Sequence, residues 1–167
     1  GDELALALRE GRLQRNFQGY SLHMADDLLG LGVSAISQIG DFYLQNTREI
    51  EDYYRLVDAG EMPFTRGCKV TTEDKLRRHI IMSLICEMRL DIGDCNRQFG
   101  IDFMAKFPGE LASLTPMAQD GLLDIRDGEI TVNHRGRPFL RNICMPFDAY
   151  LGAHSGDRPA PRFSATI

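Results

Sequence analysis

The sequence predicts an α+β chain, mainly helical, that ends in a winged-helix-like domain over residues 71–151. Apolar residues recur at helical spacing through most of this range, and the period changes to short β-type runs only between residues 122 and 132. The resulting order of three helices, a hairpin and a further helix is that of a winged helix-turn-helix domain. A length of 167 residues suggests one domain of ordinary size, or one small domain together with a piece of something larger, and a hydrophobic share of 43% is enough to form a buried core.

The first part of the chain combines a short helix with a glycine-punctuated strand region. Residues 3–9 are strong helix formers, and Gly11 is placed to end the helix. The runs 16–20 and 27–37 carry apolar β-type residues between closely spaced glycines, which predicts a buried strand with a turn at its end. We expect this strand region to extend to residue 43.

A helix and a connection follow. Asn46 and Glu49 have the spacing of a helix-starting cap, apolar residues then recur at helical spacing to Val57, and Gly60 ends the helix. Residues 61–67 are rich in turn formers, so the main domain boundary is predicted there.

The next helix has the clearest signals in the sequence. Thr71 and Asp74 form a capping box, and one stripe of apolar residues (Leu76, Ile80, Leu84 and Met88) predicts a core-facing helix. Asp94 is predicted to cap a short helix that ends at Gly100. A third helical stretch over residues 102–119 is expected to be divided or bent at its prolines.

The last elements are a hairpin and a helix. Two short β-type runs, 122–125 and 130–132, flank an Asp-Gly pair at Asp127 and Gly128 that is typical of a hairpin turn. Residues 137–151 return to a helical pattern, and the Gly, Ser, Pro and Arg-rich tail over 152–167 is expected to be irregular.

The charge of the winged-helix-like region argues against nucleic-acid binding. The net charge of the chain is -5, and residues 91–130 contain eight acidic residues and three basic ones. Phosphate contacts supply most non-specific affinity for DNA, so an acidic surface there repels it. No apolar run reaches the length of a membrane span, and we expect a cytoplasmic protein that binds neither nucleic acid nor membrane.

The sequence contains no pattern for a metal site or a catalytic triad. The four cysteines are scattered without a C-x-x-C pair, and the four histidines have no partner at helical spacing. Basic residues gather instead around the last helix and in the tail (Arg135, Arg137, Arg141, Arg158 and Arg162), where arginine forks suit carboxylates.

Several separate motifs occur in order along the chain: Arg15-Asn16-Phe17-Gln18-Gly19-Tyr20, Asp27-Leu28-Leu29-Gly30-Leu31-Gly32-Val33-Ser34-Ala35-Ile36-Ser37, Arg77-Arg78 with Ser83-Leu84-Ile85-Cys86, and Arg141-Asn142-Ile143-Cys144-Met145 with Phe147-Asp148-Ala149-Tyr150-Leu151. Together they resemble the C-terminal third of bacterial oxygen-independent coproporphyrinogen III oxidase, a radical S-adenosylmethionine family. The resemblance extends over essentially the whole chain.

The resemblance implies a fold and an organisation. Residues 1–45 would be the last strand and helix elements of a partial α/β barrel, the incomplete end of the radical S-adenosylmethionine domain. Residues 46–70 would form a connecting helix and linker, residues 71–151 the winged-helix-like domain that covers the substrate cleft, and residues 152–167 the tail.

The resemblance also implies an activity. The family oxidatively decarboxylates two propionates of coproporphyrinogen III to give protoporphyrinogen IX in haem biosynthesis, using S-adenosylmethionine and a 4Fe-4S cluster. The C-x-x-x-C-x-x-C motif that holds this cluster is absent here. We therefore expect a C-terminal portion that is inactive alone and monomeric, with the N-terminal barrel and coproporphyrinogen III as its partners.

Two site residues follow from the matched motifs. Ile36 corresponds to a family position that lines bound S-adenosylmethionine, and Gln18 resembles a nearby ligand-contacting position. The arginines around the last helix and in the tail are further candidates for contacts with the substrate carboxylates. Two alternatives remain: a winged-helix DNA-binding regulator, and a haem-binding relative of the same superfamily.

Overall fold

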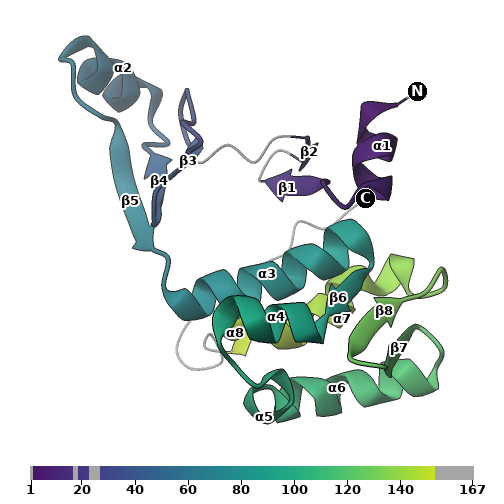
Figure 1. Ribbon diagram of the computed structural model, residues 1–167. Helices are drawn as coiled ribbons and strands as arrows, with labels where there is room; N and C mark the ends of the chain where they lie inside the picture. Colours follow the sequence, from purple (N-terminus) through teal and green to yellow (C-terminus); the bar gives the residue numbers. More distant parts are fainter. Residues whose placement is uncertain (1, 17–18, 23–26, 153–167) are drawn as a thin grey trace. The chain divides into compact units, whose positions relative to one another are not determined.

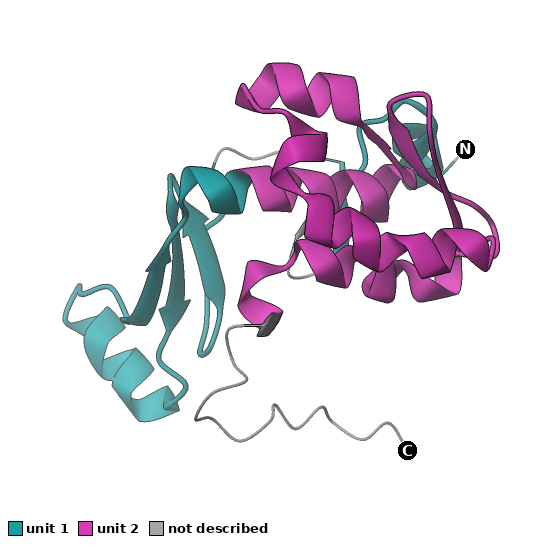
Figure 2. Cartoon of the chain, turned by 90° about the horizontal axis from the view of Figure 1, so that it is seen from below, with its two compact units in different colours: residues 1–75 teal, residues 76–167 magenta. Residues whose placement is uncertain are grey.

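The structure is a computed structural model that describes residues 2–16, 19–22 and 27–152. The chain divides into two compact units, unit 1 over residues 1–75 and unit 2 over residues 76–167 (Figure 2). Both units contain helices as well as strands, which confirms the mixed α and β class. The described strands form three small antiparallel sheets, none of which closes into a barrel.

Unit 1 consists of a helix, a short hairpin, and a three-stranded sheet with a second helix (Figure 1). Strands β3, β4 and β5 are adjacent in that order, and β1 pairs with β2. The elements are α1 (Glu3–Arg9), β1 (Gln14–Asn16), β2 (Gly19–Ser21), β3 (Ile36–Ile39), β4 (Phe42–Asn46), α2 (Ile50–Asp58) and β5 (Phe64–Lys69).

The strand region of unit 1 differs from the sequence prediction in two places. Residues 29–35 are irregular, and only Leu28 pairs with the free edge of β3, through a bridge to Gln38. The predicted connection over 61–67 instead overlaps β5 (Phe64–Lys69), whose residues are mostly exposed. An edge strand without apolar alternation has no period-2 signal, so its pattern was indistinguishable from that of a loop.

The cap predicted for α2 is wrong. Asn46 is the last residue of β4 and is buried, and the N-cap is Glu49, which makes no side-chain capping bond. Asn46, whose polar side chain would suit the start of a helix, lies in the sheet instead.

Unit 2 is a helical layer with a three-stranded antiparallel sheet in the order β6-β8-β7. Its first helix, α3 (Thr72–Glu87), begins in the last residues of unit 1. The other elements are β6 (Arg89–Asp91), α4 (Ile92–Phe99), α5 (Phe103–Lys106), α6 (Pro108–Gln119), β7 (Leu123–Arg126), β8 (Glu129–Val132), η1 (Arg137–Phe139), α7 (Leu140–Cys144), η2 (Met145–Phe147) and α8 (Ala149–Gly152).

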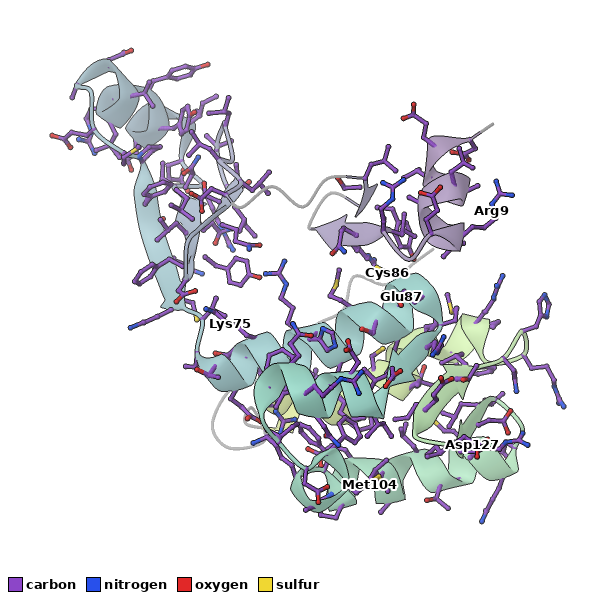
Figure 3. All side chains as sticks on the ribbon, viewed as in Figure 1. Arg9, Lys75, Cys86, Glu87, Met104 and Asp127 are labelled. Carbon is purple, nitrogen blue, oxygen red and sulfur yellow. The ribbon has the colours of Figure 1, made fainter. Side chains whose placement is uncertain are left out.

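The start of α3 and the hairpin confirm the sequence predictions. Thr71 Oγ1 accepts a hydrogen bond from the Asp74 amide at 3.1 Å, and Asp74 accepts one from the Thr71 amide at 2.8 Å, which is a reciprocal capping box. Asp127 and Gly128 have φ of 53° and 78°, as a type I′ turn requires. Asp127 lies in this turn between β7 and β8 (Figure 3).

Two other helix boundaries are corrected. The N-cap of α4 is Asp91, which accepts from the amide of Asp94 at 2.7 Å, so Asp94 lies inside the helix that it was predicted to cap. The helix predicted over 137–151 is broken into α7, α8 and two 3₁₀ turns, because Pro138 and Pro146 each stand near the start of a turn.

The hydrophobic core lies in unit 2. Three members of the predicted stripe, Leu76, Ile80 and Leu84, lie on α3 and are at most 2% exposed. The fourth, Met88, follows the end of the helix with φ of 58° and is half-buried against the core. These side chains pack with residues of the sheet and of the later helices, among them Leu90, Phe103, Phe107, Leu114, Leu123, Ile130, Ile143 and Phe147. None of the helices in the described ranges is long and apolar enough to cross a membrane.

Candidate functional site

Ile36, the first predicted site residue, begins β3 and is half-buried. The register pairs it with Gln45 of β4, and Gln45 pairs with Arg66 of β5. Directly paired residues of antiparallel strands project their side chains to the same face of the sheet. Ile36, Gln45 and Arg66 therefore form one row across all three strands.

A second row lies on the same face. Gln38, two residues after Ile36, pairs with Tyr43, which pairs with Cys68. Side chains two residues apart on a strand share a face. We call the surface formed by these two rows the Ile36 face; its members are Ile36, Gln38, Tyr43, Gln45, Arg66 and Cys68. It combines an apolar group, two amides, a phenol, a thiol and a guanidinium, and it contains no carboxylate.

The segment before β3 is held by hydrogen bonds to polar side chains. The Gly30 amide donates to Ser37 Oγ at 3.0 Å, and the Gly32 amide donates to the Tyr53 hydroxyl of α2 at 2.9 Å. Gly30 passes so close to β3 that a Cβ there would lie 2.7 Å from the Ile36 carbonyl oxygen. Glycine at position 30 is thus required by the close approach of two backbones.

Asn46 is the centre of this arrangement and is only 2% exposed. Its Nδ2 donates to the carbonyl oxygens of Gly30 at 3.1 Å and Gly32 at 2.8 Å, and its backbone amide donates to Ala35 at 2.9 Å. Asn46 thus holds the glycine segment, residues 30–32, together with Ala35. Because Ala35 directly precedes Ile36, these bonds define the position of Ile36. Asn46 Oδ1 is buried without a hydrogen-bond partner in the described part of the chain.

Sequence reasoning missed the role of Asn46, because its spacing to Glu49 matched a helix cap. The sequence signal for this role is the pair Gly30 and Gly32. In a tight segment outside a sheet, their carbonyl groups need hydrogen-bond donors from side chains. Gln18, the second predicted site residue, lies outside the described residues.

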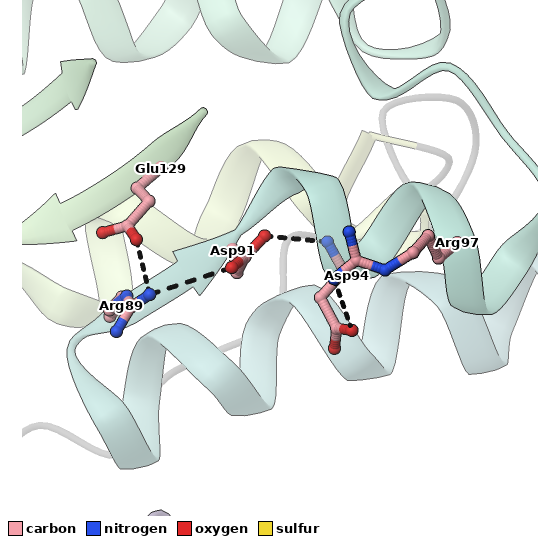
Figure 4. A network of polar contacts seen from close by, with 5 residues as sticks. All are labelled: Arg89, Asp91, Asp94, Arg97 and Glu129. Carbon is pink, nitrogen blue, oxygen red and sulfur yellow. Dashed lines mark hydrogen bonds and ion pairs between the residues drawn. The ribbon is translucent and has the colours of Figure 1, made fainter. Parts of the chain in front are cut away.

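Unit 2 has a polar pocket of about 250 Å³ between α3, β6 and α4. Arg89 bonds Glu129 at 2.5 Å, and Arg97 bonds Asp94 at 3.2 Å (Figure 4). These side chains are 35% to 72% exposed, so the pairs contribute little to stability and are solvated. The pocket residues are His79, Ser83, Glu87, Arg89, Asp91, Asp94 and Arg97.

The cysteines do not form a metal centre in the described ranges. Cys86, Cys95 and Cys144 are buried and Cys68 is exposed, and no three His, Cys, Asp or Glu side chains described here are grouped to hold a metal ion. Burial, and then the charge of Asp94, raise the pKa of Cys95 from 9.0 to about 11. This thiol is therefore protonated near neutral pH. Because no group of three potential ligands is present among the described residues, they do not fit an iron–sulfur cluster.

The arginines of the matched motifs and of the predicted basic cluster differ in their surroundings. Arg77 is built into unit 2: it donates to the Phe147 carbonyl at 3.1 Å, pairs with Glu110 at 3.2 Å and lies 5.1 Å from the centroid of the Phe107 ring. Arg135, Arg137 and Arg141 are exposed near the last helices. Arg158 and Arg162 lie outside the described residues.

The chain is similar to known proteins over nearly all of its length. Residues 70–139 match the family model of the HemN C-terminal domain. Over 150 residues, 90% of this chain, it is 51% identical to oxygen-independent coproporphyrinogen III oxidase of Salmonella typhimurium and 49% identical to that of Escherichia coli. Each of these two alignments covers 33% of the relative, so the chain spans about one third of their length.

A solved structure agrees with these sequence comparisons. The chain superposes with a TM-score of 0.85 and 49% identity on coproporphyrinogen III oxidase (HemN) from Escherichia coli, which is described as a radical SAM enzyme. The match covers 89% of this chain and 34% of that one. The resemblance inferred from the motifs is confirmed: residues 70–139 match the HemN C-terminal domain model, and about 90% of the chain is similar to one third of the oxygen-independent coproporphyrinogen III oxidases of Salmonella typhimurium and Escherichia coli.

Proposed function

We propose that this chain acts as the C-terminal third of an oxygen-independent coproporphyrinogen III oxidase, and that the complete enzyme decarboxylates two propionates of coproporphyrinogen III. The observation that carries the proposal is 51% identity to such an oxidase over 90% of the chain. At this identity, relatives generally share a fold, and the superposition on the Escherichia coli oxidase supports the same assignment.

In this proposal residues 1–45 are the last elements of a partial α/β barrel, and residues 46–70 connect them to the next domain. The distribution of apolar side chains supports an incomplete first part. Among the described residues of unit 1, the buried hydrophobic side chains are Ala7, Leu13 and Val70. Many large ones are exposed instead, including Leu4, Leu6, Leu8, Leu29, Leu31, Ile50, Tyr54, Val57 and Met62. A surface of this kind is typical of a region that packs against another part of a protein.

Residues 71–151 form the proposed winged-helix-like domain, which would cover the substrate cleft, with residues 152–167 as its tail. The order α3, β6, α4, α6, β7, β8 and the sheet order β6-β8-β7 support this label. The proposed role of this domain, to cover the substrate cleft, rests on the resemblance to the oxidases.

Ile36 and Gln18 are the proposed contacts to S-adenosylmethionine. The apolar side chain of Ile36 is half-buried and its position is defined by the Asn46 bonds, as one wall of a pocket requires. S-adenosylmethionine and a 4Fe-4S cluster supply the radical chemistry of the family, and the cluster would be held outside this chain. The 167 residues alone are therefore expected to have no oxidase activity.

The test is a chimera in which residues 1–167 replace the matching third of the Salmonella typhimurium oxidase. The chimera is expected to restore anaerobic haem synthesis in a strain without the oxidase, and to convert coproporphyrinogen III after anaerobic reconstitution. The isolated chain, reconstituted in parallel, should show neither turnover nor cluster absorbance. A soluble, cluster-loaded chimera without turnover would contradict the proposed function.

Three predictions accompany the proposal: a monomeric state, a cytoplasmic location, and no binding to nucleic acid. The acidic side chains of the winged-helix-like domain support the last, because Asp102, Asp120, Asp124 and Asp127 are exposed. Retarded migration of DNA with a steep dependence on salt would support the regulator alternative instead. Stable binding of haem by the isolated chain would support the haem-binding alternative.

A further inference from the structure

Arg66 lies in the same row of the sheet as Ile36. The pairs Ile36–Gln45 and Gln45–Arg66 place one residue of each strand side by side on the Ile36 face. Neighbouring strands are about 4.8 Å apart, so the row extends over about 10 Å from β3 to β5. A ligand that contacts Ile36 and has this width reaches the guanidinium of Arg66.

The guanidinium of Arg66 has no hydrogen bond or ion pair with the described residues. Other arginines with carboxylates nearby are paired with them, for example Arg55 with Asp52 at 3.1 Å and Arg126 with Asp124 at 2.6 Å. The two rows of the Ile36 face contain no Asp or Glu that could neutralise Arg66. The face therefore presents an uncompensated positive charge beside an apolar group.

The neighbours of Arg66 complete a surface for an amphipathic, anionic ligand. Gln45 Nε2 donates to the Ser34 carbonyl oxygen at 3.2 Å, and this hydrogen bond fixes the orientation of the Gln45 amide. Gln38 supplies a second amide in the adjacent row. Planar guanidinium groups bind carboxylates in two-point geometry, which an ammonium group does not reproduce.

We infer that Arg66 binds a carboxylate of the ligand that lies against Ile36. The inference rests on the proposed function, because that function supplies two ligands with carboxylates: coproporphyrinogen III, through its propionates, and S-adenosylmethionine, through its amino-acid end. Arg66 is a binding residue in both cases, and Ile36 supplies the apolar contact at the other end of the row.

The experiment compares Arg66→Gln, Arg66→Lys and Arg48→Gln in the oxidase chimera. Arg48 is an exposed arginine outside the Ile36 face, in the segment between β4 and α2, and serves as the matched control. The dissociation constants for coproporphyrin III, the fluorescent oxidised porphyrin, and for S-adenosylmethionine are measured separately under anaerobic conditions. Each is measured at low and at high salt, because an exposed charge pair is screened by salt.

Loss of one charge-assisted contact is expected to weaken binding of one of these ligands about tenfold in Arg66→Gln. The salt dependence of that ligand's binding should fall, Arg66→Lys should recover only part of the affinity, and Arg48→Gln should bind like the unsubstituted chimera. An effect on coproporphyrin III identifies a propionate as the partner, and an effect on S-adenosylmethionine identifies its carboxylate.

Two results overturn the inference and are distinguishable. If the chimera turns over substrate and Arg66→Gln binds both ligands within twofold of the unsubstituted chimera, Arg66 has no binding role and the proposed function stands. If a folded, cluster-loaded chimera binds neither ligand, the proposed function fails and the inference fails with it. Circular dichroism and the thermal midpoint of each variant show whether it is folded.

Discussion

At the residue scale, Asn46 shows how one buried side chain can organise a segment without regular structure. The carbonyl oxygens of Gly30 and Gly32 each accept one hydrogen bond, and both bonds come from the side-chain amide of Asn46. An amide is suited to this role because it offers two donors on one nitrogen. An aspartate at this position would be nearly isosteric and would offer only acceptors to the same two carbonyls.

Asn46→Ala should loosen the glycine segment before β3. Two partly buried carbonyl groups lose their donors, at an expected cost of about 2 kcal/mol. Hydrogen exchange of the Gly30 and Gly32 amides, measured by NMR on the whole chain, should accelerate about 30-fold. Gln45→Ala, which removes a single bond of a neighbouring residue, is the control and should change these rates by less than about threefold. Unchanged exchange in Asn46→Ala would show that other contacts hold the segment.

At the scale of elements, the connection after β8 depends on a glycine that the sequence did not single out. The Asn133 amide donates to the Leu122 carbonyl at 3.2 Å, which draws the turn over 133–136 against the start of β7. A Cβ at Gly136 would overlap the Leu122 carbonyl oxygen and approach Val132 Cγ1 to 2.8 Å. Gly136 has an ordinary negative φ of -77°, so space, and not conformation, requires glycine here.

Gly136→Ala is therefore expected to destabilise unit 2 strongly, by about 3 kcal/mol or more, because the turn and the strand have to separate. Gly109→Ala is the matched control, since a Cβ at Gly109 meets no atom within 4 Å and alanine favours the helix. Urea denaturation of the two variants should show a lower midpoint for Gly136→Ala alone. Equal midpoints would mean that the 133–136 turn moves aside without cost.

At the scale of the whole molecule, apolar burial is unequal between the two units. The residues of the hydrophobic core all come from unit 2, whereas the interior of the unit 1 sheet is polar at Ser37 and Asn46. Apolar burial is the main favourable contribution to folding, so the amides of unit 2 should require larger opening free energies.

Hydrogen exchange followed by mass spectrometry on the intact chain tests this difference. Peptides from α3, β6 and β8 should exchange slowest, and peptides from β3, β4 and β5 should exchange at least about tenfold faster. In the oxidase chimera the β3 to β5 peptides should slow toward the rate of the unit 2 peptides, because the proposed barrel covers the exposed apolar side chains. Equal protection of both units in the isolated chain would contradict the unequal burial.

The sequence by itself determined the elements whose signals are local. The capping box of Thr71 and Asp74, the apolar stripe of α3 and the Asp127-Gly128 turn depend on neighbours within a few residues, and all three are present as predicted. The matched motifs likewise sufficed to predict the similarity to the oxidases, because each motif is a continuous run.

Only the tertiary structure decided which residues share a surface. The row Ile36, Gln45 and Arg66 comes from three strands, and the Arg66 strand has no periodic pattern of its own. Asn46 likewise acts on glycines 14 and 16 residues away. Such contacts are set by strand register and backbone approach, which local propensity does not encode.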